Sequence, residues 1–287
     1  AARITEMIKA GDNYKLEDLR LQQKDVTSHA AQSLIPALLA KSGKATHSQA
    51  DMARKLLGAW DFRMDRHQIA PLLYAEWVRQ LARPLFADEL GETLFEETET
   101  THRVWFYDKV FNAKPDQAIA NWCDNTETSR IETCEDIAST ALDKALEALS
   151  KRFGDDINSW RWGDAHIALH QHQPFGYLPF IGDMFNRTIP SNGGPYTVDR
   201  GNTSLKDANA HMHLHGSAYR AVYDLAEPEK SGYMINTGQS GIPTSVYYDN
   251  LMTMWRDAEL IQIPTDPESY KRTILGTVNL SPQSNAE

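Results

Sequence analysis

The side chains in this sequence with the clearest capacity for chemistry are closely spaced histidines. They form two groups of three: His166, His170 and His172, and His211, His213 and His215. Zn²⁺ binds imidazole nitrogen well, and three protein ligands with one water molecule form a common catalytic arrangement. Alternation in the second group would place its three rings on one face of a strand. One hypothesis is therefore a zinc-dependent hydrolase.

Other features of these histidines argue against a metal site. No H-E-x-x-H sequence is present, and neither group has a carboxylate at ligand spacing. We therefore assign no metal ligands in this chain. His166, close to Trp162, is expected to be a hydrogen-bonded histidine of the core. Residues 211–215 are expected to form a partly exposed strand or loop.

A second candidate feature is a pair of opposite charges near the C-terminus. Residues 219–225 alternate aromatic or aliphatic residues with small or charged ones, which predicts a strand with one buried face. Residues 227–232 interrupt the pattern as a hairpin loop does, and residues 233–236 form the return strand. Arg220 and Asp224 share one face of the first strand, so we expect them to pair and Asp224 to be largely buried.

Two glycines follow this hairpin. Gly238 and Gly241 enclose Gln239 and Ser240, and Pro243 comes directly afterwards. Such spacing predicts a backbone that turns tightly or approaches another segment closely. Gln239 and Ser240 are therefore expected to fix a turn rather than to bind a substrate.

The chain has two cysteines, Cys123 and Cys134, which flank a short polar loop. A metal or redox pair is the alternative to a disulfide, but the sequence has neither C-x-x-C nor a His-Cys ligand pattern. We favour a disulfide that closes the loop. Disulfides persist in oxidising compartments, so this prediction also bears on location.

The elements that carry these side chains divide the chain into two parts. Apolar residues at helical spacing predict helices over residues 3–10, 16–23, 28–41, 51–57, 70–90 and 133–153. Pro36 and Pro84 are expected to kink or interrupt two of them. After residue 155 glycine, proline and β-forming residues increase. We predict an α+β fold, with a helix-rich part over 1–155 and a strand-rich part over 156–287 that pack as one piece.

Composition excludes some classes of function. The chain has 287 residues, with 29 Lys and Arg against 39 Asp and Glu, and a net charge of −10. No basic cluster is present, so nothing indicates a nucleic-acid partner. No apolar run approaches the ~18 residues of a membrane span.

Several ordered motifs resemble one family of hydrolases. G-S-x-Y-R-x-V-Y-D at 216–224 and G-Q-S-G-x-P-x-S at 238–245 precede a tryptophan at 255. W-x-W-G-x-x-H stands at 160–166, and G-G-x-x-T-V at 193–198. A-R-I-x-E-M at the start adds a weaker match. Together they resemble the C-terminal part of the large subunit of the penicillin amidase family. This family includes penicillin, cephalosporin and acyl-homoserine-lactone acylases.

The resemblance implies the C-terminal portion of a four-layer αββα amide hydrolase of the N-terminal-nucleophile class. In this class an N-terminal Ser, Cys or Thr attacks the amide, and its own α-amine is the general base. Backbone N–H groups and an Asn side chain hold the oxyanion. In the family these groups lie upstream of the matching region, and this chain starts at Ala1. We therefore expect no catalytic residue here and no activity from this chain alone.

The resemblance also implies a setting for the chain. Some of these acylases orient a histidine beside the nucleophile with a late acidic residue, for which Asp224 is the positional match. Arg220 and His166 are further candidates behind the site. Expected partners are the remainder of the large subunit, a small subunit from the same precursor and a small acylated amide substrate, in the periplasm or outside the cell. The resemblance implies no cofactor in this chain and allows a structural calcium ion in the complete enzyme.

A hypothesis from another class remains open, namely an independently folded binding or structural domain without chemistry. The sequence also leaves the substrate undecided between β-lactam and homoserine-lactone amides. The resemblance implies that the acyl pocket is built mainly by segments outside these 287 residues.

Overall fold

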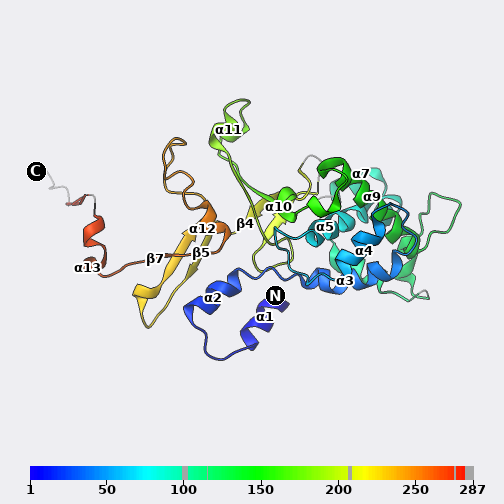
Figure 1. The fold of residues 1–287 in the computed structure, drawn as a ribbon, viewed down its shortest axis with the longest axis horizontal. Coiled ribbons are helices and arrows are strands. Elements are labelled where there is room, and N and C mark those ends of the chain that lie inside the picture. Colours follow the sequence, from blue (N-terminus) through cyan, green and yellow to red (C-terminus); the bar gives the residue numbers. More distant parts are fainter. Residues whose placement is uncertain (99–102, 115, 206–208, 275, 282–287) are drawn as a thin grey trace, which may run out of the picture.

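The first part of the molecule is helical; its helices from residue 29 onward form a packed group on the right in Figure 1, whereas the first two helices lie apart from that group, beside the sheet part. The computed structural model describes residues 1–98, 103–114, 116–205, 209–274 and 276–281. The helices of this part are α1 (Ala2–Lys9), α2 (Leu16–Gln23), α3 (His29–Lys41), α4 (Ala50–Gly58), α5 (Ala70–Gln80), α6 (Ala82–Leu90), α7 (Glu92–Thr98), α8 (Val104–Phe111), η1 (Ala118–Cys123) and α9 (Cys134–Phe153). Most of the helices predicted from spacing are therefore present with nearly the predicted bounds.

Helix α9 shows how local sequence sets these bounds. Its N-cap Thr133 accepts a hydrogen bond from the backbone N–H of Asp136, and the Asp136 carboxylate accepts one from the N–H of Thr133. This reciprocal cap satisfies two amides that the helix leaves free. Gly154 ends the helix at a φ of +86°, where other residues are strained. The buried Trp77 of α5 donates its Nε1–H to the carbonyl of Ala138, at 3.0 Å, and so joins α5 to α9.

The two prolines behave differently from the prediction. Helix α3 continues through Pro36, which lies inside it. The long helix predicted over 70–90 does divide, but it does so at Leu81 rather than at Pro84. Pro84 instead stands in the first turn of α6, where a missing backbone N–H costs little.

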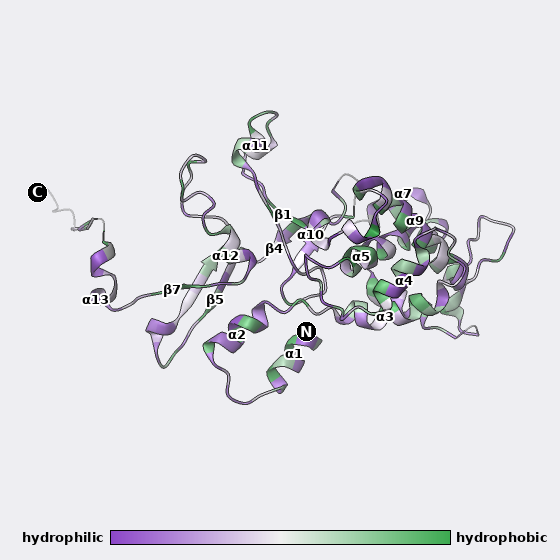
Figure 2. Ribbon diagram, in the orientation of Figure 1, coloured by the Kyte–Doolittle hydropathy of each residue, from purple (hydrophilic) through white to green (hydrophobic). Residues whose placement is uncertain are grey.

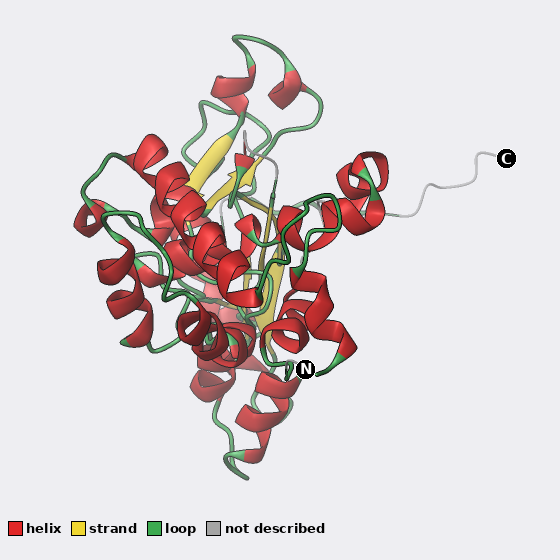
Figure 3. Cartoon of the chain, turned by 90° about the vertical axis from the view of Figure 1, so that its right-hand side faces the viewer, coloured by secondary structure: helices red, strands yellow, loops and turns green. Residues whose placement is uncertain are grey.

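The second part consists of short strands, small helices and long loops. It contains η2 (Ile157–Ser159), α10 (Trp162–Ala165), β1 (Ile167–His170), η3 (Phe175–Tyr177), α11 (Gly182–Phe185), β2 (Arg187–Pro190), β3 (Gly201–Thr203), β4 (His213–Gly216), β5 (Tyr219–Val222), η5 (Pro228–Lys230), β6 (Gly232–Ile235), α12 (Met252–Arg256), β7 (Ile261–Gln262), α13 (Pro267–Tyr270) and η6 (Lys271–Thr273). Seen from the helical end, the helices stand in front of the strands (Figure 3).

The strands form two small sheets. One has the order β2-β1-β4-β3, with β1 parallel to β4 and antiparallel to β2. The other has the order β5-β6-β7 and is antiparallel. The predicted hairpin is confirmed as β5–β6, but β5 ends at Val222 and is shorter than predicted. The chain is therefore a mixed helix-and-sheet fold, 47% helical.

Hydrophobic packing is unequal between the two parts. The helices share one large cluster that includes three fully buried tryptophans, Trp77, Trp160 and Trp162. The strands have a small cluster around Met234 and Trp255. Two loops of the second part project away from the rest on one side, one bearing α11 and the other joining β6 to α12 (Figure 1). The sheet part therefore has much less internal core than the helical part.

Candidate functional site

The W-x-W-G-x-x-H motif builds a buried column of rings between the two parts. Trp162 of α10 stacks on His166, with ring centres 4.5 Å apart and an interplanar angle of 12°. His166 stacks in turn on His213 of β4, at 5.0 Å and 9°. Trp162 also donates its Nε1–H to the carbonyl oxygen of Gly193, at 2.9 Å. One motif thus connects the helices, the strand β4 and the turn that contains Gly193.

The hydrogen bonds of His166 define its protonation. Its Nδ1 lies 2.9 Å from the carbonyl oxygen of His211, which can only accept, so Nδ1 carries the proton. Nε2 has no hydrogen-bond partner among the described residues. Burial, and to a lesser degree the neighbouring His213, lower the pKa of His166 well below its usual value. His166 is therefore a neutral ring of the core, as the sequence predicted.

Residues 211–215 are partly exposed as expected, with Leu214 and His215 at the surface, but His211 and His213 are buried. His211 Nε2 lies 2.6 Å from Oε2 of Glu76 on α5, and both side chains are almost fully buried. His213 Nδ1 lies 2.9 Å from the hydroxyl of the buried Ser191. Only His215 of this group is exposed. The alternating pattern could not reveal this, because the partner of His211 is 135 residues away.

Glu76 is a buried carboxylate of this junction that sequence reasoning missed. Burial works to raise its pKa, but hydrogen bonds and charges from His211 and Arg79 outweigh burial and lower the pKa to about 2. Gln80 donates a further hydrogen bond at 2.7 Å. A lone carboxylate on the apolar face of a predicted helix was the available signal, since a buried charge requires partners. His211 itself has a φ of +71°, which few residues other than glycine adopt.

Arg220 is buried, and its partner is Asp199 rather than the expected Asp224. Its Nη2 lies 2.5 Å from Oδ1 of Asp199, and each side chain is 7% exposed. Asp199 follows the G-G-x-x-T-V turn, in which Gly193 has a φ of +79° and the carbonyl of Asp199 approaches it closely. Burial raises the pKa of Asp199, while Arg220 acts in the opposite direction. The motif thus places a carboxylate beside Arg220 from another element.

Asp224 lies beyond the end of β5 and serves the hairpin turn. Its carboxylate accepts hydrogen bonds from the backbone N–H groups of Ala226 and Glu227, at 3.0 and 2.9 Å. Its own N–H donates to the hydroxyl of Ser231. The predicted burial and the predicted pairing with Arg220 are therefore wrong, because β5 is too short to carry Asp224 into the sheet. An influence of this residue on a catalytic histidine stays a prediction.

The remaining histidines, His170 and His172, line a cleft of about 620 Å³ beside the G-Q-S-G turn. Burial lowers the pKa of His170 to about 4. Gly238 confirms the predicted close approach, because an added Cβ would collide with the carbonyl of Tyr247, whereas Gly241 has open space around it. Ser240 lines the cleft as well. The structure therefore brings His170 and His172, but not His166, together with this motif.

The histidines do not converge on a common point. His166 and His213 stack face to face instead of directing nitrogens at one position. Within the described ranges, no group of three or more His, Cys, Asp or Glu side chains is arranged to hold a metal ion.

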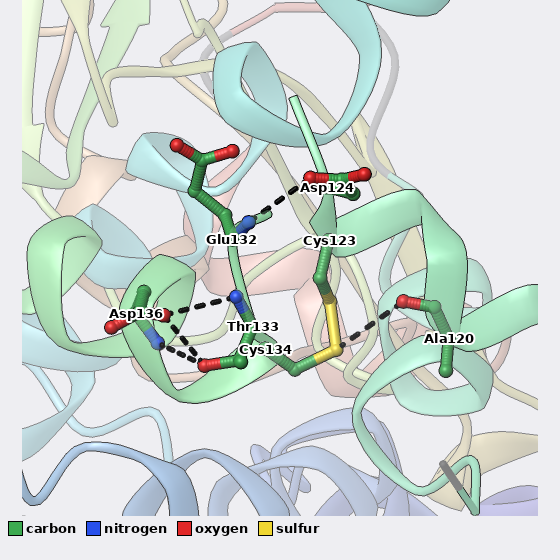
Figure 4. Close-up of a disulfide and its surroundings, with 7 residues drawn as sticks. All are labelled: Ala120, Cys123, Asp124, Glu132, Thr133, Cys134 and Asp136. Carbon is green, nitrogen blue, oxygen red and sulfur yellow. Dashed lines mark hydrogen bonds between the residues drawn. A yellow bond between two sulfur atoms is a disulfide. The ribbon is translucent and has the colours of Figure 1, made fainter. Parts of the chain in front are cut away.

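The predicted disulfide between Cys123 and Cys134 is present (Figure 4). It joins the end of η1 to the first residue of α9, with the two Cα atoms 4.9 Å apart. Within the loop, the Asp124 carboxylate accepts a hydrogen bond from the N–H of Glu132. The bridge lies in the helical part, away from the histidine column.

Comparison with known proteins shows the family. The sequence matches the penicillin amidase family over residues 1–272, and the chain belongs to this family. Among curated relatives, the acyl-homoserine lactone acylase QuiP of Pseudomonas putida is 26% identical over 78% of this chain and 28% of its own length. QuiP of Pseudomonas syringae pv. tomato is 24% identical over 95% of this chain and 34% of its own length. Penicillin acylase 2 proenzyme of a Pseudomonas species is 22% identical over 91% and 32%.

The fold agrees with this assignment. The thermostable penicillin G acylase from Alcaligenes faecalis superposes with a TM-score of 0.58 at 14% identity, over 99% of this chain and 52% of that chain. The N-terminal-nucleophile hydrolase fold predicted from the motifs is therefore confirmed. The chain spans about a third of the length of the curated relatives that it matches. No helix within the described residues is long and apolar enough to cross a membrane.

Proposed function

We propose that this chain is the C-terminal part of the large subunit of an acylase that hydrolyses the linear amide bond of a small acylated substrate. The observation that carries the proposal is a family match over residues 1–272 in a chain that spans only about a third of its acylase relatives. The nucleophile and the oxyanion-binding Asn come, in this proposal, from the upstream remainder of the large subunit. A small subunit from the same precursor completes the enzyme.

The proposed contribution of this chain is to hold strands against the helices so that the missing segments meet a rigid surface. The support for this role is the density of buried polar contacts between the two parts. His211 bonds Glu76, the N–H of Gly193 donates to the carbonyl of Met64, and the N–H of Arg66 donates to Oδ1 of Asn192. Such contacts fix side-chain rotamers and backbone positions. A catalytic site needs this kind of rigid support from the residues that surround it. Arg220 and His166 act in this proposal as positioning residues.

The substrate and the location are proposed from the relatives and from the disulfide. Relatives are named as acyl-homoserine lactone acylases and as a penicillin acylase, so we propose an amide of one of these two types. A disulfide between Cys123 and Cys134 supports the periplasm or the exterior of the cell, because disulfides are rare in reducing compartments. We assign no cofactor to this chain. The family resemblance allows a structural calcium ion in the complete enzyme.

Activity of the whole protein and of this chain tests the proposal. We expect the full-length protein to hydrolyse phenylacetyl, glutaryl or long-chain acyl amides, and the purified 287-residue chain to stay at background. Intact mass of the natural product is the companion measurement, with a heavy chain beginning at Ser, Cys or Thr and a lighter partner as the expected result. Turnover by the 287-residue chain that a point substitution within it abolishes would refute the division of roles. A native 32.4 kDa product without amidase activity would favour a non-catalytic domain instead.

A further inference from the structure

Two neighbouring arms of the sheet part expose an unusual amount of apolar surface. The first arm, residues 171–186, lies between β1 and β2 and contains η3 and α11. The second arm, residues 236–250, joins β6 to α12 and contains the G-Q-S-G turn. Both project on the same side of the molecule (Figure 1), and both carry hydrophobic segments (Figure 2). Their exposed large apolar residues are Phe175, Tyr177, Leu178, Phe180, Ile181, Met184, Ile242, Val246 and Tyr247.

The first arm is held in shape by hydrogen bonds and ring contacts among its own residues, so the exposure of its apolar side chains is a fixed feature of the fold. The side chain of Asn186 accepts a hydrogen bond from the N–H of His172 and donates one to the carbonyl of Gly176. The rings of His172, Phe175 and Phe185 pack on one another at 4.9–5.5 Å between centres. An arm built this way presents its apolar residues in a set arrangement.

The second arm is tied to the first at its base. Arg187 donates to the Asp249 carboxylate at 2.5 Å and to the carbonyl of Pro243 at 3.1 Å. Tyr248, which lies under the Arg187 guanidinium, donates its hydroxyl to the carbonyl of Phe185 at 2.6 Å. The two arms therefore form one preorganised clamp, and the cleft of about 620 Å³ lies between them.

The lining of the cleft specifies the chemistry of an occupant. Nε2 of His170 and Nδ1 of His172 are buried and have no hydrogen-bond partner among the described residues. Buried polar atoms are normally hydrogen-bonded, so a bound group should supply donors or acceptors. Arg187, the charged residue of the lining, is already neutralised by Asp249. An occupant with neutral hydrogen-bonding groups and apolar side chains fits, and these are the properties of an extended polypeptide segment.

We propose that the clamp of residues 171–186 and 236–250 holds an extended segment from the upstream part of the same polypeptide. This inference rests on the proposed function, in which that upstream part exists. The relatives extend well beyond the region matched here, and the matched acylase structure contains about as much chain again. Monomeric proteins seldom leave apolar patches of this kind uncovered. The net charge of −10 and the neutral cleft give no support to an anionic membrane or nucleic acid.

Hydroxyl-radical footprinting of the full-length protein tests the clamp without reference to activity. Met184, Tyr247 and Phe180, the last of which is 99% exposed in this chain, should be oxidised at least about tenfold more slowly in the full-length protein than in the 287-residue chain. Trp105, an exposed residue of the helical part, is the internal control and should differ little. Equal oxidation of the clamp residues in both proteins overturns the proposal.

A photo-crosslinker identifies the occupant. Benzoylphenylalanine in place of Tyr247 should attach to a peptide that precedes this chain in the same molecule. Mixed ¹⁴N- and ¹⁵N-labelled protein separates this result from attachment between two copies, which would overturn the proposal in favour of self-association. Phe180→Ser should weaken the clamp and restore oxidation of Met184 at least about fivefold. The control Ile131→Ser changes another highly exposed apolar residue, outside the clamp, and should leave Met184 protected.

The failure of this inference differs from the failure of the proposed function. Amide hydrolysis by a full-length protein whose arms oxidise freely would refute the clamp and leave the acylase proposal intact. Protected arms in a full-length protein that hydrolyses no amide would support the clamp and refute the acylase proposal.

Discussion

Replacing Asp199 by Asn should destabilise this chain far more than replacing Asp224 by Asn. Asp199 is 7% exposed and neutralises the equally buried Arg220. Removal of one member of such a pair leaves an uncompensated buried charge, which costs about 3–5 kcal/mol. Nε of Arg220 already lacks a partner among the described residues, and its Nη1 reaches the carbonyl of Gln23 only at 3.4 Å. If the Asp199 carboxylate is removed, the Arg220 guanidinium therefore has few other groups with which to form hydrogen bonds.

Asp224, which follows the C-terminal end of β5, provides a matched control. Its carboxylate accepts two backbone hydrogen bonds in a turn that is open to solvent. The side-chain oxygen of Asn can make the same turn contacts. We therefore expect Asp224→Asn to cost under about 1 kcal/mol, within the usual range for surface substitutions.

Urea unfolding of the 287-residue chain at pH 7, followed by tryptophan fluorescence, measures both free energies. Unchanged m-values would show that the variants alter stability rather than the extent of unfolding. The double variant Asp199→Leu with Arg220→Met should recover most of the loss, because an apolar pair of similar size is often as stable as a buried ion pair. If Asp199→Asn and Asp224→Asn differ by less than about 1 kcal/mol, the reasoning from burial is refuted.

Two further predictions concern the disulfide and the buried histidines. Cys123→Ser should lower the unfolding free energy by about 2–3 kcal/mol without reductant, and dithiothreitol should reduce the wild-type value to that of the variant; two free thiols in material from the native compartment would contradict the bridge. Burial lowers the pKa of His213 to about 4, whereas in the unfolded chain its pKa is near 6.5. As the pH falls, His213 therefore binds a proton in the unfolded chain before it does so in the folded chain. Stability is then full above pH ~6.5 and falls as pH approaches 4, by about 2 kcal/mol at pH 5 from this ring. His213→Phe should reduce that slope between pH 7 and 5, and an unchanged slope would place the titration elsewhere.

The parts of the fold that could be predicted are those that local sequence determines. Helix α9 has its cap, its apolar spacing and its terminal glycine within one segment, and the structure reproduces its predicted bounds within a residue. The β5–β6 hairpin follows from alternation on both sides of a breaking loop. The disulfide joins two cysteines that are only 11 positions apart. Each of these signals is contained in one short stretch of the sequence.

Pairings across the fold could not be predicted in the same way. Arg220 and Asp224 lie close in sequence, but the length of β5 is decided by pairing with β6, and it ends before Asp224. The true partner, Asp199, is positioned by a turn whose course depends on Gly193 and on contacts with the helical part. The spacing of the histidines likewise does not reveal that His211 is buried. Its burial is compensated by a contact with Glu76, which is distant in the sequence. Spacing identifies candidate residues, and tertiary contacts select their partners.

The distribution of buried polar contacts explains how a small sheet part can be held firmly. The sheets have too little apolar core of their own to fix their position against the helices by packing alone. Apolar surfaces tolerate small shifts, whereas a buried donor loses its hydrogen bond when it moves by less than an ångström. The junction is therefore made of directional contacts, including Met64 O with the N–H of Gly193 at 2.8 Å and Asn192 Oδ1 with the N–H of Arg66 at 2.9 Å. Because both turn contacts and the ring column meet at the G-G-x-x-T-V motif, a change at Gly193 should disturb the register of the strands before it disturbs the helical core.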